Sequence, residues 1–168
     1  MKRISFIVCL VVSLVTVPVG AISKEQAAAI IDHCVAIKDD LRDVQRADAR
    51  ARVYIGGKYE MILNGFVKPL NLYLVERNIS RTDLVESQSL ISETRGEFVN
   101  DYVDYQQGLE QLVSMDCKED AEQFYDKLVR VRKKRSKVDQ DMKKMDTVLN
   151  EYKVRVLKMK EGLDARKE

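Results

Sequence analysis

Apolar side chains recur along this chain at alternating steps of three and four residues. Such spacing places them on one face of an α-helix and is typical of helices that pack lengthwise against one another. Three series of this kind predict helices at about residues 24–78, 83–113 and 119–163. No stretch of comparable length shows the strict alternation of a half-buried strand. The pattern therefore predicts an all-α fold, an elongated antiparallel three-helix bundle with coiled-coil-like packing.

The first series contains one irregular step. It assigns the following positions to the packed face: Ile30, Cys34, Ile37, Leu41, Val44, Asp48, Ala51, Ile55, Tyr59, Ile62, Phe66, Pro69 and Tyr73. A step of four residues in place of three falls at the pair Gly56 and Gly57, where the helix either bends or runs through. The two glycines either let neighbouring helices approach closely or let this helix bend, and the candidates for a kink or small cleft here are Tyr54, Gly56, Gly57, Tyr59 and Phe66.

The first 21 residues have the pattern of a secretory signal peptide. Lys2 and Arg3 precede an apolar run over residues 4–17, and Pro18 and Ala21 fit a processing site after residue 21. Residues 22–168 are then the bundle domain, secreted or held in the cell envelope. The alternative is an uncleaved anchor, because residues 4–22 are nearly long enough to span a bilayer.

Two cysteines, Cys34 and Cys117, remain after residue 21. An even pair in an exported chain indicates one disulfide, against two free thiols or a bond between chains. Helix lengths agree with this interpretation: residues 34–78 span about 66 Å, and residues 83–113 return about 45 Å. Residues 114–117 add at most about 13 Å, so Cys117 is expected near the level of Cys34.

Polar residues at packed positions are expected to fix the register of the helices. In an up-down-up bundle, Arg95 lies near the level of Glu151, and Asp48 lies near Arg132 or Arg135. A binding cleft lined by these groups is the alternative.

Charge is divided unevenly along the chain. Residues 22–117 carry 11 basic and 16 acidic side chains, whereas residues 118–168 carry 16 basic and 11 acidic ones. The densest basic run consists of Arg130, Arg132, Lys133, Lys134, Arg135 and Lys137. It is expected to pair with acidic residues on the other two helices, and the alternative is an anionic envelope polymer or lipid. Aromatic residues that would stack bases are absent from this run, so no nucleic-acid partner is predicted.

The sequence carries no signature of catalysis, and we predict neither an enzyme, nor a cofactor, nor a metal site. His33 is the single histidine and adjoins a cysteine expected in the disulfide, which disfavours a Cys–His nucleophile. The spacings of common zinc, redox and serine-hydrolase motifs are also absent.

Four stretches carry a resemblance to known proteins: residues 34–38 (CVAIK), 52–60 (RVYIGGKYE), 69–71 (PLN) and 116–118 (DCK). They resemble a group of small exported helical proteins of unassigned function from reduced-genome bacteria of the Saccharibacteria (Patescibacteria) type. The resemblance covers most of residues 22–168 and implies a bacterial exported protein, without an activity or site residues. In outline the chain is also similar to periplasmic holdase chaperones with helical arms, although a matching β-core segment is missing.

These features predict a non-catalytic structural or protein-interaction module of the cell envelope or exterior, with a protein partner or self-association. The alternative from another class is a binding protein or holdase that carries a client between its helices.

Overall fold

The computed structural model describes residues 22–165, so the expected signal peptide at residues 1–21 lies outside the described residues. Within that range the chain is helical and has no strand, which confirms the all-α class. The elements are α1 (Lys24–Asp32), α2 (Cys34–Ile62), the π-helix η1 (Leu63–Val67), α3 (Lys68–Glu76), α4 (Thr82–Ser114) and α5 (Ala121–Asp164).

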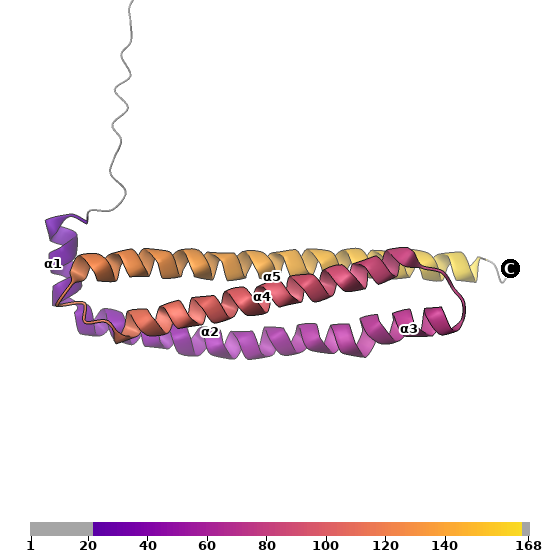
Figure 1. Ribbon diagram of the computed structural model, residues 1–168, viewed down its shortest axis with the longest axis horizontal. Helices are drawn as coiled ribbons and strands as arrows, with labels where there is room; N and C mark the ends of the chain where they lie inside the picture. The colour runs from indigo at the N-terminus through magenta and orange to yellow at the C-terminus, as the bar shows by residue number, and fades with distance from the viewer. Residues whose placement is uncertain (1–21, 166–168) are drawn as a thin grey trace, which may run out of the picture.

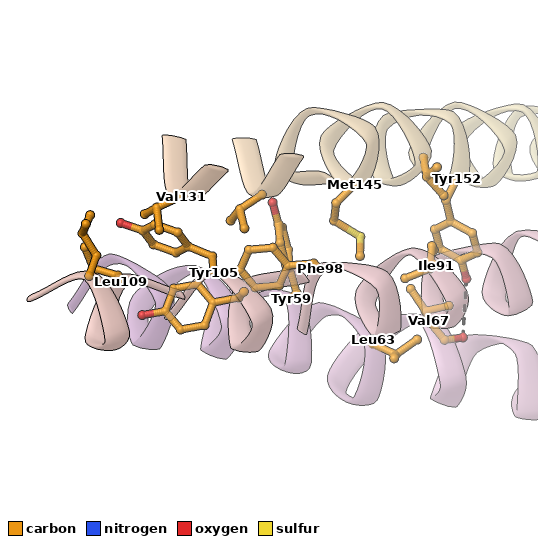
Figure 2. Packing of buried hydrophobic residues seen from close by; sticks show 14 of the residues in the cluster. Tyr59, Leu63, Val67, Ile91, Phe98, Tyr105, Leu109, Val131, Met145 and Tyr152 are labelled. Carbon is orange, nitrogen blue, oxygen red and sulfur yellow. Dashed lines mark hydrogen bonds between the residues drawn. The ribbon is translucent and has the colours of Figure 1, made fainter. Parts of the chain in front are cut away.

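The long helices lie side by side in an elongated bundle (Figure 1). α4 and α5 are antiparallel and share the most extensive packing, and the α2–η1–α3 arm runs along α4. Buried positions on α4 and α5 follow the three- and four-residue steps of the sequence; among them are Ile91, Phe98, Tyr105, Val131, Val138, Met145 and Tyr152. Figure 2 shows side chains of this set, among them Phe98, Met145 and Tyr152, between the helices.

The single helix expected at residues 24–78 is instead divided, first of all at His33. Ser23 caps the start of α1 by accepting a hydrogen bond from the Gln26 N–H, and α1 ends at Asp32. Figure 1 shows α1 turned across the end of the bundle, where it contacts α5. Ile30 is buried in this contact region. The turn at His33 therefore lets α1 cover the apolar end of the core.

The disulfide between Cys34 and Cys117 is confirmed, with a Cα–Cα distance of 5.7 Å. Both cysteines are buried, and they join the first residue of α2 to the turn between α4 and α5. The Lys38 ammonium donates a hydrogen bond of 2.9 Å to the carbonyl of Met115 in the same turn. The start of α2 is thus fixed to the α4–α5 pair by one covalent and one polar link.

The second departure from a continuous helix is η1, and not the glycine pair. α2 runs through Gly56 and Gly57 as one continuous helix, which is the second of the two alternatives stated for this pair. In η1 the Lys68 N–H donates to the carbonyl of Leu63, five residues back. We attribute this wide turn to Pro69, which lacks an N–H and whose ring would crowd the carbonyl of Gly65 in a regular helix.

The wide turn shifts the packed face of the first arm by one residue. The heptad series places Phe66, Pro69 and Tyr73 in the core, but all three are exposed. Their C-terminal neighbours Val67 and Leu74 are buried instead, because a π-turn inserts one extra residue into the helical repeat. This shift decides which side chains of residues 63–76 face solvent.

We predict that removing the disulfide with the double variant Cys34→Ser/Cys117→Ser lowers the free energy of unfolding by about 4 kcal/mol. The bond closes a loop across a sequence separation of 83 residues, and the loss follows from the entropy that the unfolded chain regains. Urea unfolding followed by circular dichroism measures the change. A reductant should destabilise the wild type and leave the double variant unaffected. Equal urea midpoints for the wild type and the double variant without reductant would contradict the prediction.

Candidate functional site

A three-residue polar cluster joins α2, α4 and α5 in the half of the bundle that carries the disulfide. The Arg135 guanidinium on α5 donates two hydrogen bonds to Asp48 on α2, from Nε to Oδ2 at 2.8 Å and from Nη2 to Oδ1 at 2.9 Å. The Tyr105 hydroxyl on α4 donates to Asp48 Oδ2 at 2.6 Å. The structure therefore brings together Asp48 and Arg135, two of the four polar seam residues chosen from the sequence.

The cluster changes the proton affinity of its members. Partial burial acts to raise the pKa of Asp48, but the hydrogen bonds from Arg135 and Tyr105 together hold it below its ordinary value. The pKa of Tyr105 is raised, first by its burial and then by its hydrogen bond to the Asp48 carboxylate. Asp48 is thus held ionised and Tyr105 protonated, which suits a structural link better than proton transfer.

The other expected seam pair does not form. Arg95 on α4 forms an ion pair with Glu60 on α2, and Glu151 is exposed on α5. Levels along a bundle do not specify which neighbouring helix a side chain faces, and Arg95 faces α2. The expected pairing of Arg95 with Glu151 is therefore wrong, and the partner of Arg95 is Glu60.

An open cleft of about 400 Å³ lies beside the cluster, bounded by α2, α4 and α5. Its apolar walls come from Ala51, Ile55, Phe98, Tyr102, Val138 and Met142. Its polar lining includes Asp48, Arg52, Arg132 and Arg135. The cleft exists because α2 has no buried residue between its first residue and Tyr59, and its backbone does not approach that of α5 closely.

Aromatic side chains form a continuous row along the α4 side of the cleft. Ring centroids are 5.8 Å apart for Tyr59 and Phe98, 6.4 Å for Phe98 and Tyr102, and 6.2 Å for Tyr102 and Tyr105. Figure 2 shows the rings of Tyr59, Phe98 and Tyr105 between the helices. The Arg52 guanidinium lies 5.3 Å from the Tyr102 ring centroid, a cation–π geometry. The cleft therefore combines an aromatic wall with guanidinium groups.

The cleft does not lie at the residues expected from the sequence. Tyr54 and Phe66 are exposed on the outside of the arm, and Gly57 is exposed as well. Tyr59 is buried in the core, and burial raises its pKa to about 12. Sequence reasoning placed Tyr102 on the packed face of residues 83–113 but assigned it no part in a cleft, and it missed Arg52, whose position flanks the packed Ala51.

Half of the basic run at residues 130–137 forms ion pairs along the partly exposed seams of the bundle. Lys134 pairs with Asp104 at 2.7 Å, and Lys137 pairs with Asp101 at 3.0 Å and with Asp141 at 2.5 Å. Burial raises the pKa of Asp141, whereas the hydrogen bond from Lys137 lowers the pKa of Asp101. With Arg135 already on Asp48, these pairs follow the expectation of charge pairing between helices.

No family model matches the chain, and no curated protein or solved structure is similar enough to count as a relative. Across residues 22–165, no helix combines the length and apolar character that crossing a membrane requires. The same part of the chain brings no three His, Cys, Asp or Glu side chains together in a way that would hold a metal ion.

We predict that Asp48→Asn lowers the free energy of unfolding by about 1–2 kcal/mol at pH 7, because it removes the charge from two hydrogen bonds with Arg135. The folded-state pKa of Asp48 is lowered, so its contribution is present above the unfolded pKa of about 3.9 and is lost as the pH falls through the folded pKa. Urea unfolding at a series of pH values measures the difference between the two proteins.

The matched control is Asp43→Asn, which breaks an exposed pair with Arg46 on the same helix and is expected to cost less than about 0.5 kcal/mol. A difference between Asp48→Asn and wild type that stays constant from neutral to strongly acidic pH would contradict the role given to Asp48.

Proposed function

We propose that this protein is an exported, non-catalytic interaction module of the cell envelope or exterior. In this proposal the arms at residues 34–76, 82–114 and 121–164 act as an antiparallel three-helix rod with coiled-coil-like packing. The single observation that carries it is the disulfide between Cys34 and Cys117. Such bonds persist in oxidising compartments outside the cytosol, and this one fixes the end of a rigid rod.

The polar clusters support a binding role over a catalytic one. Asp48 accepts hydrogen bonds from Arg135 and Tyr105, and the second carboxylate that lines the cleft, Asp139, pairs with Lys143. Both carboxylates at the cleft are therefore already engaged. Asp141 is buried beside Lys137, where no substrate reaches it. These ionisable groups stabilise the packing of the helices, and the surfaces outside them are available to a partner.

We predict that the protein recovered from an exporting bacterial host begins near Ile22 and has no free thiol. Intact mass spectrometry under non-reducing conditions, with and without alkylation, measures both properties. The matched control is Cys34→Ser/Cys117→Ser, which is expected to have the same N-terminus. A chain that begins at Met1 and carries alkylated cysteines would contradict export of this module.

A second candidate function rests on the cleft. We propose that it takes an apolar or aromatic group carrying a negative charge, either from a small molecule or from a client chain. The aromatic wall at Phe98 and Tyr102 fits the apolar part, and Arg52 and Arg132 supply the positive charge.

We predict that the anionic dye 8-anilinonaphthalene-1-sulfonate binds in this cleft and that Ala51→Phe, which fills it, weakens binding at least about tenfold. Dye fluorescence titration gives the dissociation constants. Ala47→Phe is the matched control, because Ala47 is exposed one turn earlier on α2 and does not line the cleft. Equal weakening by both variants would contradict a site at the cleft.

A further inference from the structure

Exposed apolar side chains gather on the side of the first arm that faces away from α4 and α5. Of the fifteen large apolar side chains exposed in the described part of the chain, seven lie within residues 53–75. We define the outer face by Tyr54, Met61, Phe66, Leu72 and Tyr73, which are 51% to 76% exposed. No described element packs over this side, as Figure 1 shows for the edge of α2 and α3.

The backbone of the arm builds this face. The π-turn η1 buries Val67 and Leu74 and thereby places Phe66 and Tyr73 at the surface. A regular helix continuing the phase of Tyr59 would have packed Phe66 and Tyr73 inward. The exposed aromatic residues are thus a product of the local geometry.

Packing inside the bundle does not explain why three positions on the same arm are glycine. A Cβ placed on Gly56, Gly57 or Gly65 meets nothing within 4 Å, so no packing inside the bundle requires a glycine there. Glycine in a helix interior costs about 1 kcal/mol relative to alanine. Gly57 and Gly65 are exposed. Because they carry no side chain, a broad surface can approach the helix backbone closely at these positions.

The charges around the outer face are mainly positive. Arg50, Lys58, Lys68 and Arg77 are exposed, and none of them forms an ion pair with a described residue. The two acidic residues between positions 50 and 77 are Glu60, which is paired with Arg95, and the exposed Glu76. The occupant of this face should therefore be apolar and negatively charged.

A second copy of the chain does not fit these charges. An antiparallel pairing that sets Tyr54 opposite Tyr73 also sets Arg50 opposite Arg77 and brings Lys58 to within one residue of the position opposite Lys68. A parallel pairing sets each cation opposite itself. Like charges held face to face destabilise either arrangement.

We propose that the outer face binds the surface of an anionic lipid membrane. This proposal names the partner of the interaction module proposed above. It rests on that proposed function for the location of the protein at the cell envelope or exterior. From Tyr54 to Tyr73 the arm presents aromatic and aliphatic side chains over about 28 Å, with lysine and arginine among them, as interfacial helices do. The rod lies along the membrane, with Lys58 and Lys68 at the level of the headgroups.

The test measures binding of the full chain to vesicles of phosphatidylcholine with about one third phosphatidylglycerol, against phosphatidylcholine alone. Cosedimentation gives the partition constants. We expect Lys58→Gln/Lys68→Gln to lower partitioning into the anionic vesicles about tenfold. Phe66→Ser/Tyr73→Ser should lower it by a similar factor, because it removes apolar contact with the membrane. All variants are recovered from the same exporting host, so any contribution of residues 1–21 is common to them and cancels in the comparison.

Matched controls come from α5. Lys153→Gln/Lys160→Gln removes two exposed lysines, and Val154→Ser/Leu157→Ser removes two exposed apolar side chains. Both controls should partition within about twofold of the wild type. Hydrogen exchange on the unaltered chain adds a measurement that requires no variant: anionic vesicles should slow exchange over residues 54–75.

Outer-face variants that partition like the controls, or unchanged exchange over residues 54–75, would overturn the proposal. A dimer in sedimentation velocity that Phe66→Ser/Tyr73→Ser dissociates would overturn it in favour of a second copy. Neither result affects export or the disulfide, which the N-terminus and the thiol count test separately. The failure of the membrane proposal is therefore distinguishable from the failure of the proposed function.

Discussion

The buried seam between α4 and α5 is the contact on which the rest of the structure depends. These helices are antiparallel and interlock through apolar side chains such as Phe98, Leu109, Val131 and Met145. Burial of such side chains is the main favourable contribution to folding, so this pair provides a firm surface. The first arm has few buried residues of its own and takes its position from that surface.

The first arm is held at both ends and stands open in the middle. At one end the disulfide of Cys34 fixes it; at the other, Asn71 Nδ2 donates to the carbonyl of Leu84 at 3.0 Å, and Val67 and Leu74 are buried. Between Cys34 and Tyr59 no residue of the arm is fully buried, and the polar contact of Asp48 with Arg135 and Tyr105 links this part of the arm to α4 and α5. The cleft and the outer face are two sides of this loosely packed arm, which explains why both candidate binding surfaces occur on it.

The basic side chains of α5 and those of α2 and α3 have different surroundings. Much of the basic run on α5 is neutralised by acids of the other helices, which fixes the relative placement of the helices more than it adds stability. The cations on α2 and α3 are fewer, yet Lys58 and Lys68 remain available beside exposed apolar residues. The membrane proposal therefore assigns the anionic partner to α2 and α3, in place of residues 130–137, which the sequence offers as the alternative anionic-ligand surface.

The sequence by itself determined the helical class and the Cys34–Cys117 link, because helical rise and heptad spacing are local properties. Its spacing placed Asp48 at the level of Arg132 or Arg135, and the structure selects Arg135. Only the tertiary structure decided the turn at His33, the partner of Arg95 and the position of the cleft. The one-residue shift at η1 also escaped the heptad pattern, since both phases of residues 63–74 offer apolar side chains. Packing against α4 and α5 buried Val67 and Leu74 and left Phe66 and Tyr73 at the surface.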